Sequence, residues 1–395
     1  MTGPTASRGG SDHPLAILVA PDSSKGSLTS VEVARALADG WRRARPHDEV
    51  RLAPLADGGE GTLVAIEAAG GWAWRTAAAH DPIGREIEAP WLVSADGIRA
   101  VVELAAASGL SRLAPDERDA VNASTFGTGE VLRAVLDAGI RRIDLGVGGS
   151  ATSEGGLGIL AALGLGMTVD PVLVVHLDDL DPRLAEVDLR IASDVTNPLL
   201  GAAGAAAVYG PQKGATPVDV ANLDAALGRW ADALEAATGH RERETPGAGA
   251  AGGAVFGLAC LRGRFRSFAI LPGIDLLMEA TGFAEKLVGA DLVVTGEGRV
   301  DAQTAFGKTA LGVARRAQAA GIPCVAVGGG VEPEGIAALA EVGAAAVPVT
   351  ERPQSVEEAM SAGPAPLERC GERLARLVGL GIGLRSGAGG GPHGV

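Results

Sequence analysis

The sequence predicts two α/β domains with mainly parallel sheets, the middle domain being inserted into an outer one. The first indication is the length of 395 residues, because a single hydrophobic core stops growing at roughly 250 to 300 residues. The second is an alternation of short apolar runs with segments of helical periodicity, which is typical of parallel sheets whose strands are connected by helices. The third is that similar strand-like runs occur near both ends of the chain, so both ends are expected in one sheet.

The N-terminal elements illustrate this alternation. An apolar run over 15–20 predicts a buried strand, and after a polar loop Val33, Leu37 and Trp41 share one face of a helix that begins near Ser30. A second strand, a glycine-rich loop and a second helix follow, over 50–55, 55–62 and 63–70.

The C-terminal third of the chain repeats the pattern and completes a Rossmann/flavodoxin-like outer domain. Its predicted strands lie at 290–296, 322–329 and 344–350. Four runs between the two ends predict the sheet of the inserted domain: IRAVVELA, RRIDLGVGG, DLRIASDV and AAAVYG. The expected domains are 14–75 plus 287–382 (outer) and 76–286 (inserted), with flexible tails at 1–13 and 386–395.

Composition excludes several classes of function. The net charge of −14 repels nucleic-acid phosphates and anionic lipid, and no cluster of Lys and Arg offsets it. The chain lacks the ~20 continuous apolar residues of a membrane span and the apolar segment of a signal peptide. Its cysteines, Cys260, Cys324 and Cys370, are widely spaced without a CxxC motif, which argues against disulfides. We therefore expect a cytoplasmic protein that binds neither nucleic acid nor membrane.

Five loops that follow predicted strands are the candidate sites, because open α/β sheets bind ligands beyond the carboxyl ends of their strands. In the first, Ser23 and Lys25 precede a helix N-terminus, whose N–H groups favour anions. The structural alternative is a capping loop with a solvated Lys25.

The next two loops are rich in glycine, which lets the backbone approach a ligand closely. The loop 55–62 carries Asp57, Gly58, Gly59 and Glu60 and suits a magnesium nucleotide, although a tight turn is an equal alternative.

The loop 146–158 has six glycines in thirteen positions. Gly148, Gly149 and Ser150 therefore predict an anion nest of backbone N–H groups.

The last two loops carry charged side chains. Asp194 follows an apolar run and can accept a hydroxyl proton or bind a metal, unless it forms a turn with Asn197. Glu297, Arg299 and Asp301 follow another strand, and such carboxylates and cations suit magnesium and a bound anion. The alternative for this loop is a solvated charged turn.

These loops together closely resemble the bacterial glycerate kinases of the class that includes the glyoxylate and glucarate pathway enzymes. The resemblance covers about residues 15–380 in collinear order. The matching blocks are APDSSKGSLTS, PLADGGEGT, GVGGSATSEGGLG, SDVTNPLLG with VYGPQKGA, PGAGAAGG, and VTGEGRVDAQTAFGKTALGVARRA. One departure is Glu154, where the family usually has Asp, so a ligand contact there would shift.

The resemblance implies transfer of the ATP γ-phosphoryl group to a hydroxyl of D-glycerate, the 2-hydroxyl being favoured over the 3-hydroxyl. The cofactors implied are ATP and Mg²⁺, and a homodimer is left open. The expected proton acceptor is Asp194, and the expected magnesium ligands are Asp301 and Glu297. Lys25 is expected to be the phosphate cation and Arg299 the partner of the glycerate carboxylate. The expected nucleotide- or phosphate-binding groups are Ser23, Gly58, Gly59, Gly148, Gly149 and Ser150.

Alternatives stay open at this point. Asp194 and Asp301 can exchange roles. The motif GAGAAG at 247–252 matches a dinucleotide fingerprint and would favour a nicotinamide oxidoreductase, but it follows a polar segment instead of a strand. A non-catalytic nucleotide-binding regulator would keep the glycine loops without requiring Asp194 and Asp301 together.

Overall fold

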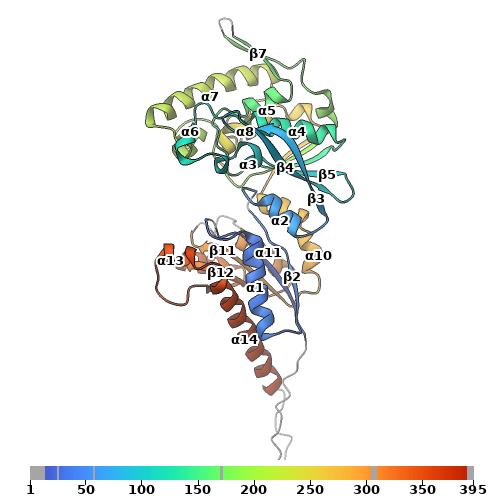
Figure 1. Cartoon of the computed structure of the whole chain (residues 1–395), viewed down its shortest axis with the longest axis vertical. Coiled ribbons are helices and arrows are strands. Elements are labelled where there is room, and N and C mark those ends of the chain that lie inside the picture. The colour runs from blue at the N-terminus through green and yellow to red at the C-terminus, as the bar shows by residue number, and fades with distance from the viewer. Residues whose placement is uncertain are drawn as a thin grey trace, which may run out of the picture. The chain divides into compact units, whose positions relative to one another are not determined.

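The computed structural model describes residues 14–24, 26–56, 58–169, 172–302, 304 and 309–388. The chain divides into two compact units (Figure 1). The first unit comprises Met1–Leu55 and Gly282–Val395, and the second comprises Ala56–Thr281. Among the described residues, no helix combines the length and apolar character needed to cross a membrane.

The first unit contains a five-stranded parallel sheet with strand order β13-β12-β11-β1-β2. Strands from both ends of the chain therefore pair, with β1 next to β11. The elements of this unit are β1 (Ala16–Pro21), α1 (Ser30–Ala44), β2 (Glu49–Leu52), α10 (Phe283–Leu287), β11 (Leu292–Val300), α11 (Thr309–Ala319), β12 (Cys324–Val331), α12 (Pro333–Glu341), β13 (Ala345–Pro348), α13 (Val356–Ser361) and α14 (Ala365–Ala388).

Helices α1 and α14 lie side by side in this unit (Figure 1). The predicted helical face is confirmed, since Val33, Leu37 and Trp41 are all buried. Glycine permits the close approach: a Cβ at Gly40 would lie 1.8 Å from the carbonyl oxygen of Glu368. This helix pair therefore covers the sheet through an apolar face with almost no space between the two backbones.

The second unit contains a six-stranded mixed sheet with order β10-β9-β6-β5-β4-β3, of which β10, β9, β6 and β5 are parallel. A two-stranded hairpin, β7-β8, is separate. The elements of this unit are α2 (Thr62–Ala68), β3 (Trp72–His80), β4 (Glu86–Ser94), β5 (Arg99–Glu103), α3 (Leu104–Ser108), α4 (Phe126–Asp137), β6 (Arg142–Gly146), α5 (Leu157–Ala162), β7 (Gly166–Val169), β8 (Leu173–His176), β9 (Asp188–Ala192), α6 (Ala205–Tyr209), α7 (Pro217–Thr238), α8 (Ala250–Cys260), β10 (Ser267–Leu271) and α9 (Gly273–Ala280).

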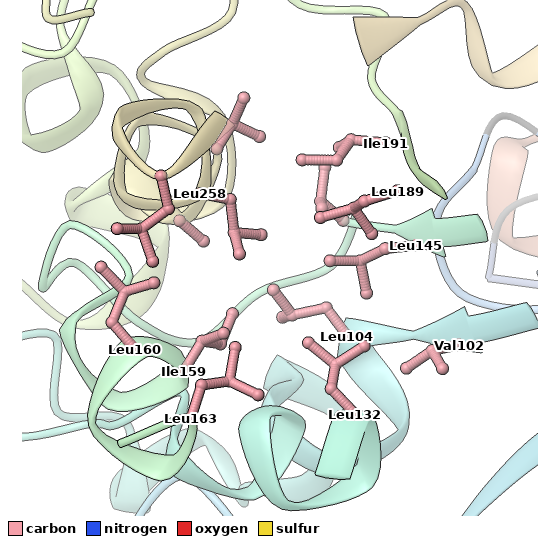
Figure 2. Close-up of a cluster of buried hydrophobic side chains, with 14 of the residues drawn as sticks. Val102, Leu104, Leu132, Leu145, Ile159, Leu160, Leu163, Leu189, Ile191 and Leu258 are labelled. Atoms are coloured by element: carbon pink, nitrogen blue, oxygen red, sulfur yellow. The ribbon is translucent and has the colours of Figure 1, made fainter. Parts of the chain in front are cut away.

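The core of the second unit lies between this sheet and helices α4, α5 and α8. Figure 2 shows side chains from strands and helices pointing toward one another, with Leu145 and Ile191 on the sheet side and Leu132, Ile159 and Leu258 on the helix side. All five are buried. Aliphatic contacts of this kind fix the parallel strands and therefore the loops that leave their carboxyl ends.

The α/β class with mostly parallel sheets is confirmed, but three details differ from expectation. The run AAAVYG forms helix α6 instead of a strand, because alanine favours helix and Ala205 and Ala206 are buried against other helices. Helix α14 continues through Ala388, so the expected C-terminal tail begins too early at 386. Helix α2, expected in the outer domain that ended at 75, belongs to the second unit.

Glu103 explains why α2 belongs to the second unit. Helix α2 follows Gly61, which has φ +92° and offers no side-chain cap. The buried carboxylate of Glu103, at the end of β5, instead accepts hydrogen bonds from the N–H groups of Gly61 (3.3 Å) and Leu63 (3.2 Å). A strand of the second unit therefore supplies the missing N-cap.

We expect Glu103→Gln to flatten part of the pH dependence of folding stability. Burial raises the pKa of the Glu103 carboxyl to about 7, despite the opposing backbone hydrogen bonds. Because this pKa exceeds the unfolded value, the stabilising contribution is complete below about pH 4 and is lost as the pH rises through about 7. Denaturant unfolding should give a wild-type advantage over the variant that falls by up to about 3 kcal/mol from about pH 5 to 8.

The exposed Glu88 on β4 supplies the matched control. Glu88→Gln should leave the same pH profile unchanged. A difference between wild type and Glu103→Gln that stays constant with pH would contradict the assignment.

Candidate functional site

The second unit brings two of the predicted glycine loops into direct backbone contact. The N–H of Gly148 donates to the carbonyl of Gly58 at 3.3 Å. A Cβ at Gly148 would lie 2.5 Å from the Cα of Gly59, and one at Gly146 would lie 2.7 Å from the Gly58 carbonyl oxygen. Only glycine fits such an approach, so these glycines are used for loop packing.

A cavity of about 220 Å³ opens beside this contact, at the carboxyl ends of β6 and β9. The ends of these strands are level, because Gly146 pairs with Ala192 in the parallel register. The residues that line the cavity are Val147, Gly148, Gly149, Ser150, Ala192, Ser193, Asp194, Val195, Tyr209, Gln212, Lys213, Ala250 and Ala251. The predicted residues Gly148, Gly149, Ser150 and Asp194 therefore share one cavity.

Asp194 lies in the cavity wall and also contacts a distant helix. Its Oδ1 accepts a hydrogen bond from the N–H of Gly273 at 2.9 Å, and Gly273 begins α9, whose N-cap Pro272 has no capping side chain. The side chain of Asn197 in the same loop has other partners: its amide donates to the Ala203 carbonyl at 2.8 Å and accepts from the Tyr209 hydroxyl at 2.7 Å. The carboxylate of Asp194 is thus held at the strand end by a helix N-terminus, where negative charge is favoured.

Lys213 is a cavity residue that sequence reasoning missed. It ends the 3₁₀ helix η4 (Pro211–Lys213) and is 2% exposed. Its Nζ donates to Ser150 Oγ at 2.9 Å and to the Thr152 carbonyl at 2.5 Å. The block VYGPQKGA contained this lysine, but a single lysine between glutamine and glycine resembles an ordinary solvated loop residue.

Ala251, which lines the cavity, has an unusual backbone conformation. It is the non-glycine residue with positive φ (+53°) among the described residues, and it lies beside Gly252 and Gly253 at the start of α8. A Cβ at Gly252 would lie 1.9 Å from the carbonyl oxygen of Thr152. The motif GAGAAG therefore permits a close approach of two backbones. Ala251 keeps an energetically unfavourable conformation, which persists only where the surrounding structure enforces it.

Glu154, the departure from the family pattern, has a structural arrangement of its own. Its Oε1 accepts hydrogen bonds from Thr125 N and Thr125 Oγ1, both at 2.6 Å, and from Gly158 N at 3.0 Å. The carboxylate thus joins the start of α4 to the start of α5. The glutamate side chain, one methylene longer than aspartate, therefore points to donors within the protein.

The first unit holds a second set of polar groups at the ends of β1 and β11. Asp22 is buried; its Oδ2 accepts from Thr309 Oγ1 at 2.7 Å and its Oδ1 from the N–H of Ser23 at 2.6 Å. The first turn of α11 is thereby tied to the loop after β1. Lys25, the predicted phosphate cation in that loop, lies outside the described residues, as do Asp57 and Lys308.

The predicted magnesium ligands lie close to each other along the end of β11. Thr304 Oγ1 donates to Glu297 Oε1 at 2.5 Å and accepts from the N–H of Asp301 at 3.0 Å. Arg299 forms an ion pair with Glu332, and its Nε lies 3.8 Å from Asp301 Oδ2. In the described part of the chain no three His, Cys, Asp or Glu side chains form a preformed metal cluster.

We expect Gly148→Ala to destabilise the protein and to lower any activity of the cavity. The new methyl group would force the loop off Gly59 and disrupt the Gly58 hydrogen bond, and overpacking of this kind typically costs about 1 to 3 kcal/mol. Gly228→Ala is the control, because its Cβ would meet only Leu200 Cδ1 at 3.8 Å within α7. Thermal unfolding should separate the two, and equal melting temperatures would contradict the packing role.

Comparison with known proteins agrees with this arrangement over nearly the whole chain. The model of the glycerate kinase family matches residues 17–379. A glycerate kinase of Halalkalibacterium halodurans is 40% identical, with 91% of this chain and 97% of the relative covered. The Escherichia coli protein named glycerate 2-kinase is 38% identical, with 79% of this chain and 84% of the relative covered.

A solved structure extends the similarity to the fold. The crystal structure assigned to glycerate kinase 2 from Salmonella typhimurium LT2 has a TM-score of 0.79 and 34% identity, and the alignment covers 93% of this chain and 99% of that one. Sequence and fold agree over both units, and this chain belongs to the glycerate kinase family.

Proposed function

We propose that this protein transfers the γ-phosphoryl group of ATP to the 2-hydroxyl of D-glycerate, giving 2-phosphoglycerate and ADP. The observation that carries the proposal is the cavity of the second unit, which is lined by residues 147–150 of the glycine loop, by Asp194 and by Lys213. The choice of the 2-hydroxyl follows the 38% identical Escherichia coli relative that is named glycerate 2-kinase.

Phosphoryl transfer needs few covalent steps from the protein. Charge spreads over the phosphoryl oxygens in the transition state, so catalysis depends on positioning, hydrogen-bond donors, cations and a proton acceptor. The backbone N–H groups of Gly149 and Ser150 suit phosphate oxygens, whereas that of Gly148, also a predicted phosphate contact, donates to the Gly58 carbonyl. A small-molecule kinase of this kind is also consistent with the acidic net charge of −14, which disfavours nucleic-acid partners.

Asp194 is the proposed acceptor of the substrate hydroxyl proton. Gly273 N–H binds one carboxylate oxygen, Oδ1, and fixes the side chain at the end of β9. A fixed carboxylate can orient the attacking hydroxyl and take its proton as the bond to phosphorus forms. Asp301 stays the alternative base.

The acidic groups of the first unit fit a magnesium ion by donor chemistry. Mg²⁺ prefers oxygen ligands and keeps several waters. The carboxylate of Glu297 accepts from the hydroxyl of Thr304, and the same hydroxyl accepts from the backbone N–H of Asp301, which brings the two acidic residues to one turn. When bound, Mg²⁺ would neutralise charge on the nucleotide phosphates. Ser23, Gly58 and Gly59 stay predicted nucleotide contacts, Lys25 a predicted phosphate cation and Arg299 a predicted anion partner; a cytoplasmic location and a homodimer also stay predictions.

The direct test is ADP release with and without D-glycerate. A glycerate kinase releases ADP rapidly only when D-glycerate is present. A nucleotide-binding regulator would bind ATP without D-glycerate-dependent release, and an oxidoreductase would change the absorbance of a nicotinamide cofactor instead. Absence of D-glycerate-dependent ADP release from folded protein would reject the proposal.

Asp194→Asn should lower kcat by about 10² to 10⁴, the usual loss for a general base. Asparagine keeps an oxygen that can accept from Gly273 N–H but cannot take the proton, so ATP affinity and the melting temperature should stay near those of wild type. The matched control is Asp275→Asn in the first turn of α9. It removes a charge from a residue that does not line the cavity. A kcat within about threefold of wild type would exclude Asp194 as the base and favour Asp301.

A requirement for a divalent cation should be visible in steady-state kinetics. Excess chelator should abolish turnover and added Mg²⁺ should restore it, because ATP reacts as its metal complex. Glu297→Gln removes one charged oxygen donor and should raise the Mg²⁺ concentration needed for half-maximal rate, whereas Glu334→Gln on α12 should not. Full activity in chelator, or an unchanged Mg²⁺ requirement in Glu297→Gln, would count against the magnesium role.

A further inference from the structure

Lys213 is a buried cation to which neither the family blocks nor the proposed reaction gives a role. Only 2% of its surface is exposed, yet it lines the cavity. Within the described part of the chain, Ser150 Oγ and the Thr152 carbonyl accept from its Nζ. An ammonium group carries three N–H donors, so one donor stays available to a group inside the cavity.

The surroundings of Lys213 do not balance its charge. Among the described residues, no carboxylate forms an ion pair with it, although most other buried charges in the second unit are paired, as Asp144 is with Arg99 and Arg190. Burial lowers the pKa of Lys213 to about 7. A buried cation without an anion is destabilising, and proteins retain such groups where a ligand supplies the missing charge.

Three other polar or charged groups lie near this cation. Asp194 and Tyr209 line the same cavity, and the Tyr209 hydroxyl donates to Asn197 Oδ1 at 2.7 Å. Arg118 Nη1 donates to the carbonyl of Gln212 at 3.3 Å, next to Lys213 in the chain. Asp194 is exposed and bound to a helix N-terminus. Among the residues that line the cavity, Lys213 is the one with a cationic side chain.

The size and chemistry of the cavity favour a small acid. Its volume of about 220 Å³ is below the range of roughly 300 to 1,000 Å³ typical of drug-sized ligands, and a nucleotide is of that larger kind. A three-carbon hydroxy acid needs one cation at one end, hydroxyl and amide partners along its length, and a carboxylate near the reacting hydroxyl. Ser150, Ser193 and Asp194 supply the remaining groups, and the Ser193 hydroxyl is buried without a hydrogen-bond partner among the described residues.

We propose that Lys213 binds the carboxylate of D-glycerate in this cavity and thereby fixes which end of the substrate faces Asp194. The inference rests on the proposed function and makes it more specific. It differs from the expected role of Arg299, whose side chain is 65% exposed and already paired with Glu332 in the first unit. Lys213 is better suited, because a desolvated cation attracts a carboxylate more strongly than an exposed cation does.

Calorimetric titration of Lys213→Met with D-glycerate tests the role directly. Loss of a buried charge-assisted hydrogen bond should weaken binding about 10- to 100-fold, while ADP affinity stays within about threefold. Weak binding of uncharged glycerol should not change. The melting temperature should stay equal or rise, because an unpaired buried charge is removed and Ser150 Oγ, 3.5 Å from the Thr152 carbonyl, can donate in place of the ammonium.

The control variants separate the alternatives. If Arg299→Lys weakens D-glycerate binding and Lys213→Met does not, Arg299 is the carboxylate partner and the proposal is overturned. Loss of ADP affinity in Lys213→Met with D-glycerate binding preserved would also overturn it in favour of a phosphate contact. If the methionine variant does not fold, Lys213→Gln, which keeps a donor but no charge, gives the same comparison.

Proton uptake by the unaltered protein provides a second, variant-free test. Because the pKa of Lys213 lies at about 7, the group is mostly neutral at about pH 8, and a bound carboxylate should return its proton. Titrations in two buffers of different ionisation enthalpy should show nearly one proton taken up per D-glycerate at about pH 8 and almost none at about pH 5.5. Binding without uptake at the higher pH would overturn the proposal, whereas failure of wild type to phosphorylate D-glycerate that it binds would reject the function alone.

Discussion

The structure of the candidate site depends on the contact between the two glycine loops of the second unit. Gly58 and Gly59 approach Gly146 and Gly148 so closely that no Cβ fits between them. This contact holds the start of the loop after β6, where Gly149 and Ser150 line the cavity. A similar close approach joins Thr152 to Gly252, which is next in the chain to the cavity residue Ala251. The high glycine content of these loops is therefore a packing requirement first, and the anion-binding backbone follows from it.

Capping interactions place the charged groups on this glycine framework. Glu103 caps α2 from the end of β5, and Asp194 binds the start of α9 from the end of β9. In both cases a carboxylate at a strand end satisfies helix N–H groups that the local sequence leaves uncapped. Lys213 is the exception, since it is buried beside neutral oxygens. The unbalanced charge is the feature that distinguishes this cavity from an ordinary packing defect.

Sequence reasoning succeeded where the signal was local. The periodicity of Val33, Leu37 and Trp41 identified α1, and glycine density identified the loop 146–158. It failed where distant residues decide the outcome. Asp194 and Gly273 are 79 positions apart, and the burial of Lys213 depends on the position of η4 against the loop of Ser150. AAAVYG has an apolar composition that fits either a strand or a helix, and its tertiary contacts select the helix. The expected boundary at residue 75 placed α2 in the outer domain, but the helix is capped by Glu103 of β5 and belongs to the second unit.

In the proposed complex, D-glycerate lies with its carboxylate at Lys213 and its 2-hydroxyl toward Asp194. Phosphorus NMR of the products formed from ATP and D-glycerate tests this orientation, because it identifies the phosphorylated oxygen. We expect 2-phosphoglycerate together with an equal amount of ADP. Formation of 3-phosphoglycerate would contradict the proposed orientation, and ADP accompanied only by inorganic phosphate would contradict glycerate phosphorylation itself.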